Sequence, residues 1–188
     1  MQLPSHKLQV ILETERLILK EVNPEIIDYV FTQWSDEDIM SYMGLQSVEE
    51  LAVEKKKQQG GFTTHRINLK GFLFISKETN EVIGASHYHV WQPMHSRAEI
   101  GYAIYKEEYK NKGYMKEAIK AMLNYGFNEM KLNRVEALIG PANEASIRLV
   151  KSFGFVEEGV LREHYCKNGE LQDSICFSLL KREWISNN

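Results

Sequence analysis

The sequence predicts an α/β fold with a mixed sheet, and three observations support this. Strand-like and helix-like hydrophobic patterns are interleaved along the 188 residues. Residues 97–104 alternate apolar and polar side chains as a strand does, whereas residues 115–130 repeat apolar side chains at helical spacing. The length suits one domain with a sizeable core, and no stretch has the composition of a linker. We therefore expect residues 1–188 to form a single domain.

The N-terminal part is predicted to contain a strand and two helices. Residues 1–13 should form a loose lead-in to a strand at residues 16–20. Asn23-Pro24 then starts a helix, since proline is tolerated in the first helical turn. Ser47-Val48-Glu49-Glu50 is a capping box for a second helix, which should end at Gly60-Gly61.

The middle of the chain supplies three strands. Residues 72–75 and 82–85 flank the turn residues Thr79-Asn80, which predicts a hairpin, and residues 97–104 form the next strand. A helix, a strand, a helix and a final hairpin follow, at residues 115–130, 134–139, 143–153 and on both sides of Asn168-Gly169. Asn-Gly is the strongest signal for a type I′ hairpin turn.

Composition excludes several classes of protein. The chain has 23 basic and 26 acidic residues, a net charge of −3, which disfavours a nucleic-acid binder and mildly favours a cationic partner. No apolar stretch approaches the roughly 20 residues that span a bilayer, and the N-terminus lacks the pattern of a signal peptide. Cys166 and Cys176 are too few for a disulfide framework. We expect a cytoplasmic protein with reduced thiols and no contact with membranes.

The strongest chemical signal is a strand that runs into a loop and then into a helix directly after Gly113. The first turn of a helix offers free backbone N–H groups and a partial positive charge, and a glycine there lets a phosphate approach closely. Lys110 and Lys112 add two charges. The pattern favours a pyrophosphate-bearing ligand, although ordinary turns share it. Neither a Walker A loop nor a G-x-G-x-x-G pattern is present.

Five blocks, in order, cover nearly the whole chain: residues 14–19, 99–102, 110–115, 143–155 and 168–184. Together they resemble the GNAT superfamily of N-acetyltransferases, and specifically its RimJ/RimL-type branch, which acetylates protein N-terminal amines. The resemblance implies a mostly antiparallel central sheet flanked by helices, with a splay between strands 97–104 and 134–139 where pantetheine inserts. It also implies direct transfer of an acetyl group from acetyl-CoA to a primary amine, with no metal.

The same resemblance assigns the residues that would bind acetyl-CoA. They are Tyr102, Ala103, Ile104, Lys110, Asn111, Lys112, Gly113, Tyr114, Met115, Lys116, Asn143, Ser146 and Lys151. Two of them depart from the family pattern, since Lys110 replaces the usual Gln or Arg and Met115 replaces a small residue. Lys151 is placed to reach the ribose 3′-phosphate, but an ordinary surface lysine fits the sequence nearly as well.

Two residues are candidates for the chemical step by this resemblance. Glu99 matches the acidic residue that serves as base, and its alternative is an ion pair with Arg97 or Arg134. Ser146 matches the serine that stabilises the departing thiolate in this branch, because the position used by a tyrosine elsewhere is Val150 here. Ser146 could equally be an ordinary first-turn serine. Asn143 is expected to cap its helix and, by the resemblance, to bond pantetheine.

The acceptor side is less well defined. Tyr165 is the third catalytic candidate. Tyr165 and Glu163 could border the acceptor amine or be ordinary strand residues. His87 and His89 share a strand face, but the absence of a third ligand in register favours a place in the acceptor cleft or in packing over a zinc site. The same choice between cleft and core applies to three aromatic residues, Trp34, Tyr88 and Trp91.

Three functions are consistent with these residues. The first is acetylation of a protein N-terminal α-amine, such as that of a ribosomal protein. The second is acetylation of a small amine, such as a polyamine, an aminoglycoside or an amino-acid-like metabolite, because a fold does not fix the acceptor. The third is a non-catalytic acyl-CoA-binding regulator, which the joint presence of Glu99, Asn143 and Ser146 disfavours. The exposed strands expected in such a sheet also make a homodimer plausible.

Overall fold

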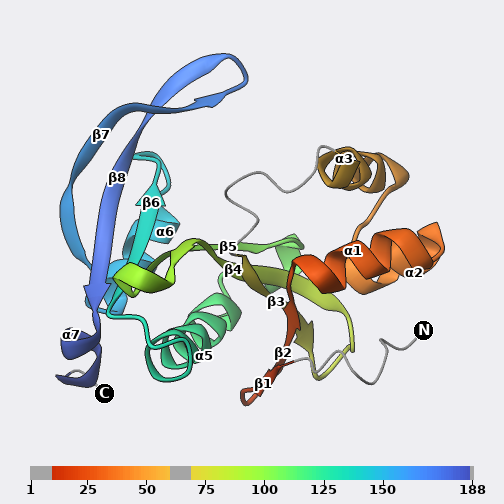
Figure 1. The fold of residues 1–188 in the computed structure, drawn as a ribbon, viewed down its shortest axis with the longest axis horizontal. Coiled ribbons are helices and arrows are strands. Elements are labelled where there is room, and N and C mark those ends of the chain that lie inside the picture. Colours follow the sequence, from red (N-terminus) through yellow and green to blue (C-terminus); the bar gives the residue numbers. More distant parts are fainter. Residues whose placement is uncertain (1–9, 60–68, 187–188) are drawn as a thin grey trace. The chain divides into compact units, whose positions relative to one another are not determined.

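The computed structural model describes residues 10–59 and 69–186 (Figure 1). The chain divides into two compact units. Unit 1 comprises Met1–Val90 and Gly101–Met122, and unit 2 comprises Trp91–Ile100 and Leu123–Asn188. Within the described residues, no helix is both long enough and apolar enough to cross a membrane.

Unit 1 contains strands, three N-terminal helices, a short helix and the first part of a longer one. The strands are β1 (Ile11–Glu13), β2 (Leu17–Val22), β3 (Lys70–Ser76), most of β4 (Val82–Gln92) and the second half of β5 (Arg97–Ile104). The helices are α1 (Pro24–Gln33), α2 (Asp36–Met43), α3 (Val48–Gln59), the short η2 (Glu107–Tyr109) and the first part of α5 (Tyr114–Asn128).

The N-terminal helices form because each has a cap and an apolar stripe. The Asn23 side chain accepts a hydrogen bond from the Ile26 amide at 2.9 Å, and Ser35 does the same for Asp38 at 3.2 Å. Gly44 ends α2 in the left-handed conformation. The apolar stripes of the three helices meet in a buried cluster of Ile26, Val30, Ile39 and Leu51.

Strand β4 has two distinct faces in unit 1. Ala85, His87 and His89 alternate with the fully buried Ser86 and Tyr88. The Tyr88 hydroxyl donates a hydrogen bond of 2.8 Å to the Met122 carbonyl of α5. The face of β4 that carries Tyr88 is therefore core, whereas the face that carries the histidines is only partly covered.

Unit 2 contains the remaining strands and the C-terminal hairpin. Its elements are η1 (Pro93–His95), the first half of β5, the last part of α5, β6 (Arg134–Ile139), α6 (Glu144–Ser152), β7 (Val156–Lys167), β8 (Glu170–Leu180) and α7 (Lys181–Ser186). Strand β6 pairs with β5 in parallel and with β8 antiparallel. The hairpin of β7 and β8 is the long blue ribbon of Figure 1.

The structure confirms the predicted fold class and most of the predicted elements. The bounds of β5 and β6 agree with the prediction, and Asn168 and Gly169 have the φ values of +53° and +85° that a type I′ turn needs. The expected end of a helix at Gly60-Gly61 lies outside the described residues. The prediction of a loose lead-in over residues 1–13 was wrong at its end, because β1 pairs there with β2. Helix α2 was not predicted.

Candidate active site

The loop after β5, in unit 1, has the geometry of an anion cradle. Asn111 and Gly113 both have left-handed φ values, of +58° and +83°. The two turns bring the chain to Tyr114, where α5 begins. The Glu117 amide donates a hydrogen bond of 3.1 Å to the Gly113 carbonyl, which is the first i to i−4 bond of α5. The amides of residues 114–116 precede it and have no partner within the helix. These N–H groups, with the positive end of the helix dipole, fit a pyrophosphate.

An unpredicted contact braces this loop. Glu117 of α5 accepts hydrogen bonds of 2.6 Å from the Thr14 hydroxyl, 2.7 Å from the Arg16 amide and 2.7 Å from Arg16 Nε. Arg16 also donates 3.0 Å to the Lys112 carbonyl, and its guanidinium lies 4.2 Å from the centre of the Tyr114 ring. The motif at residues 14–16 therefore fixes the start of α5 and the loop before it.

The side chains of the loop differ in their surroundings. Lys110 forms an ion pair with Glu107, three residues before it, whereas Lys112 and Lys116 are exposed. Met115 is half-buried beside the buried Tyr114, which packs edge-on against Tyr109 at 5.6 Å.

The strand residues expected to pair with pantetheine lie at the end of β5. Tyr102, Ala103 and Ile104 all belong to unit 1. Just before these residues, the Gly101 carbonyl accepts a hydrogen bond of 2.9 Å from the Ser86 hydroxyl. Just after them, the Tyr105 amide donates a hydrogen bond of 2.9 Å to the Ile83 carbonyl. This end of β5 is therefore held against β4.

Glu99 lies in unit 2, where its strand pairs with β6. It stands in register with Glu136. Arg97 and Arg134 form ion pairs with Glu136, at 2.9 and 2.7 Å, and Arg134 forms another with Glu158, at 2.9 Å. Both arginines therefore share Glu136 as a partner, and the role of Glu99 stays a prediction.

The start of α6 brings Asn143 and Ser146 together. The Asn143 side chain caps the helix by accepting 3.2 Å from the Ser146 amide, as predicted. The half-buried Ser146 hydroxyl therefore lies in the first helical turn, where the positive end of the helix dipole favours a nearby anion such as a thiolate.

Tyr165 shares a polar pocket with Asn143 in unit 2. The pocket has a volume of about 800 Å³ and is lined by residues 140–143 and by the hairpin residues Tyr165, Lys167, Leu171, Gln172 and Asp173. The Tyr165 hydroxyl donates a hydrogen bond of 2.8 Å to the Gln172 side chain. A Cβ placed on Gly140 would lie 3.1 Å from this hydroxyl. The glycine thus lets the phenol approach the end of β6.

Two other unit 2 candidates have local partners. Lys151 forms an ion pair of 3.2 Å with Glu157, and its ammonium lies 5.6 Å from the centre of the Phe177 ring. The Glu163 amide donates 2.8 Å to Asp173, which holds the left-handed turn at φ +51° within β7.

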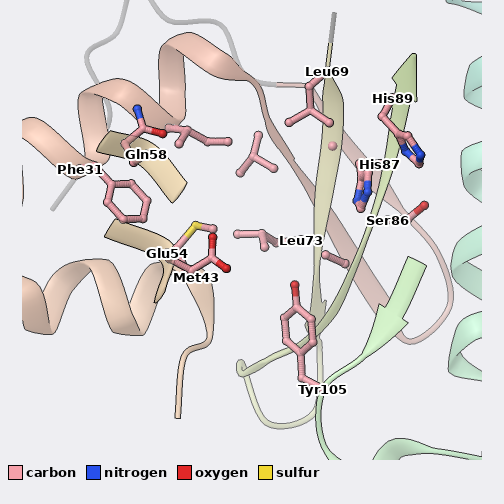
Figure 2. Close-up of a pocket in the computed structure, with 14 residues that line it drawn as sticks. Phe31, Met43, Glu54, Gln58, Leu69, Leu73, Ser86, His87, His89 and Tyr105 are labelled. Carbon is pink, nitrogen blue, oxygen red and sulfur yellow. The ribbon is translucent and has the colours of Figure 1, made fainter. Parts of the chain in front are cut away.

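A second pocket, in unit 1, contains His87 and His89. Its volume is about 350 Å³. Figure 2 shows Phe31 and Gln58 on its helical side and Ser86, His87 and His89 on its β4 side. The two imidazole rings lie 5.0 Å apart. A Cβ on Gly101 would lie 2.9 Å from His87 Nε2, so the glycine lets the histidines approach β5.

The three aromatic candidates lie in different parts of the structure. Tyr88 is fully buried, and Trp34 packs on the helical cluster at 5.1 Å from Tyr42, so neither lines this pocket. Trp91 belongs to unit 2.

Among the described residues, no group of three or more His, Cys, Asp and Glu side chains is placed to hold a metal. Both cysteines are free thiols. The pKa of Cys176 is raised, and burial is the main cause.

Comparison with known proteins identifies the family to which the chain is similar. The acetyltransferase (GNAT) domain family matches residues 16–156. The uncharacterized N-acetyltransferase p20 of Bacillus licheniformis is 36% identical over 177 residues, which cover 92% of this chain and 97% of that protein. A solved structure of a putative acetyltransferase superposes with a TM-score of 0.69 at 21% identity, over 99% of this chain and 91% of that one.

Two further relatives have names that state an acceptor. The putative ribosomal N-acetyltransferase YdaF of Bacillus subtilis is 39% identical over 101 residues, 54% of this chain and 55% of that protein. The spermidine N(1)-acetyltransferase of Escherichia coli is 27% identical over 95 residues, half of each chain.

Proposed function

The chain belongs to the GNAT acetyltransferase family, and from this premise we propose that it transfers an acetyl group from acetyl-CoA to a protein N-terminal α-amine. The main support for acetyl-CoA as cosubstrate is the loop before α5, which has two left-handed residues and is followed by the first amides of the helix. The cradle suits the pyrophosphate of CoA, and Lys112 and Lys116 add positive charge beside it.

The loop and the end of β5 would hold the cosubstrate through backbone groups. Residues 113–116 bind the pyrophosphate, and Tyr102, Ala103 and Ile104 pair with the amides of pantetheine. Asn143 adds a side-chain bond to pantetheine, and Lys110, Asn111 and Lys151 lie at the periphery. Arg16 and Glu117 do not touch the ligand in this scheme. They fix the loop so that little ordering is needed when the ligand binds.

Acetyl-CoA supplies an activated thioester when bound. Glu99 accepts a proton from the attacking amine as the new C–N bond forms and the C–S bond breaks. Ser146 stabilises the sulfur as a thiolate, which leaves as CoA after it takes up a proton. An α-amine has a pKa of about 8, whereas a lysine-type amine has one of about 10.4. A single carboxylate is therefore a sufficient base for an α-amine, and Tyr165 borders that amine.

The protein N-terminus is favoured by the relative named as a putative ribosomal N-acetyltransferase. A small amine is the second candidate, and the relative named as a spermidine acetyltransferase favours it. Acceptors of both kinds are primary amines and would use the same cosubstrate loop, but a polyamine amine, with its higher pKa, is harder to deprotonate than an α-amine.

Calorimetric titration with acetyl-CoA, followed by a thiol-release assay with amine acceptors, tests this proposal. We expect micromolar affinity for acetyl-CoA and release of CoA only when a primary amine is added. A protein that does not bind acetyl-CoA would contradict the proposal at the cosubstrate. A protein that binds acetyl-CoA but acetylates no peptide or small amine would contradict the proposed transfer.

A further inference from the structure

The unit 1 pocket is lined mainly by apolar groups. Helices α1 and α2 contribute Ile27, Phe31 and Met43, and the strands contribute Val22, Leu73 and Ala85. Its volume of about 350 Å³ lies within the range of small-molecule sites, about 300–1,000 Å³. Burial of an apolar group against such walls is favourable in proportion to the area removed from water.

The pocket adjoins the strand that we expect to hold pantetheine. Its polar side is formed by His87 and His89 of β4, and Tyr105, which follows β5 directly, also lines it. A Cβ at Gly101 would contact both imidazole rings, at 2.9 and 3.1 Å. The residue after Gly101 begins the segment 102–104. A group that occupies this pocket therefore lies beside the cosubstrate strand within the same unit.

The polar groups of the pocket give little attraction for a second cation. Its single acidic group among the described lining residues is Glu54, which bonds Lys57 of its own helix at 2.5 Å. Burial, and then the charges of Glu54 and Glu50, raise the pKa of Tyr105 to about 12, so its hydroxyl stays neutral. The Glu54 carboxylate is thus already partnered by Lys57.

We propose that this pocket receives a bulky apolar group carried by the acceptor, so that the chain prefers primary amines that carry a large apolar side chain. The assignment rests on the proposed acetyl transfer and narrows its acceptor. The amine forms the C–N bond and gives up its proton as before, while the apolar group fills the space between Phe31 and Ala85. Serine-led or alanine-led peptides would leave the pocket largely empty, and a polyamine would bring a second charge into it.

The test compares acceptors that differ only in the side chain next to the amine. Phenylalaninamide, leucinamide, serinamide and glycinamide form one series, and pentapeptides led by the same four residues form another. Spermidine is added as a charged amine. We expect kcat/KM for the Phe and Leu members to exceed that for Ser and Gly at least tenfold, because burial of a side chain of this size favours binding by at least that factor. A preference for the pentapeptides over the amides identifies a protein N-terminus, and the reverse identifies a free amine.

Two substitutions link the preference to the pocket. Ala85→Leu fills the cavity from β4 and should lower kcat/KM for phenylalaninamide at least tenfold. Ala52→Leu makes the same change at an exposed position of α3 and should leave all values unchanged. Phe31→Ala removes one wall and should raise KM for the Phe and Leu acceptors while KM for serinamide stays the same. Acetyl-CoA titration of each variant reports whether the fold and the cosubstrate site are intact.

Several results would overturn this assignment. Equal or better turnover of serinamide, glycinamide or spermidine by the wild type would overturn the apolar specificity and leave the acetyl transfer standing. An unchanged preference in both Ala85→Leu and Phe31→Ala would show that the specificity arises elsewhere. A protein that binds acetyl-CoA and acetylates none of these amines would overturn both the specificity and the transfer.

Discussion

Gly113 has the clearest role at the scale of single residues. Its φ of +83° suits glycine alone among common residues, and a Cβ there would lie 3.4 Å from Arg16 Nη2. We predict that Gly113→Val lowers the affinity for acetyl-CoA at least tenfold in calorimetric titration, because the β-branched side chain displaces the loop from the anion position. Gly169→Ala imposes a similar strain at φ +85° in the hairpin turn and should leave that affinity unchanged. Equal affinities in the two variants would contradict the placement of the pyrophosphate.

Ser146 tests the chemical step. Its bond to sulfur strengthens as the thiolate forms, so Ser146→Ala should lower kcat about tenfold or more while the Kd for acetyl-CoA changes less than twofold. Pre-steady-state thiol release and calorimetry measure the two quantities separately. A kcat equal to that of the wild type would exclude Ser146 from the mechanism. A parallel loss of kcat and affinity would make it a binding residue instead.

Residues with local roles were the ones that the sequence could predict. Asn143 caps α6 because capping depends on residues three positions apart. The partners of Arg97 and Arg134 could not be predicted, for the opposite reason. Arg97 and Arg134 bond Glu136, and that choice depends on the register of two strands more than thirty residues apart in sequence. Partners of this kind follow from tertiary pairing, which a residue pattern does not contain.

At the scale of elements, Glu117 joins the segment before β2 to the start of α5. Burial alone would raise the pKa of the Glu117 carboxyl, but bonds from Thr14 and from the amide and guanidinium of Arg16 outweigh it and hold the pKa below the usual 4.5. Folding therefore favours the ionised form. The resulting stabilisation is complete above about pH 4.5 and is lost as the pH falls through the lowered folded pKa.

Glu117→Gln should remove this pH dependence. We predict that the difference in free energy of unfolding between wild type and Glu117→Gln is constant from pH 7 to about 5 and shrinks below it, as measured by urea denaturation. Glu129→Gln removes an exposed carboxylate just beyond α5 and should leave the acid limb of the wild type unchanged. A difference that stays constant down to pH 3 would show that the carboxylate is not ionised preferentially in the folded state.

The elements that the sequence predicted are those with long or regular patterns. Strand β5 alternates over eight residues, and α5 repeats apolar side chains over four turns, so both were located closely. Strand β1 has three residues and exists through its pairing with β2, which no local pattern reveals. Helix α2 follows α1 after two residues, and the Ser35 cap between them marks it only in retrospect.

At the scale of the whole molecule, the unit 1 pocket was beyond prediction. Its walls come from three helices, three strands and the residue after β5, which are spread over the sequence, and only the His87 and His89 pair pointed to it. The phosphate loop, by contrast, is continuous over residues 110–116 and was recognisable. A contiguous binding loop can be identified from a sequence, whereas an acceptor pocket assembled from many elements requires the fold.

Binding of acetyl-CoA should also appear as added stability of the entire chain. A ligand that binds only the folded state at 100 times its Kd adds about 2.7 kcal/mol. For a chain of 188 residues this corresponds to a rise in Tm of about 5–11 °C in differential scanning calorimetry. At the same acetyl-CoA concentration Gly113→Val should gain much less, because its site is weakened, while Gly169→Ala should gain the full shift from a slightly lower starting Tm. A full shift in Gly113→Val would place the ligand away from the loop before α5, and no shift in the wild type would contradict binding to the folded chain.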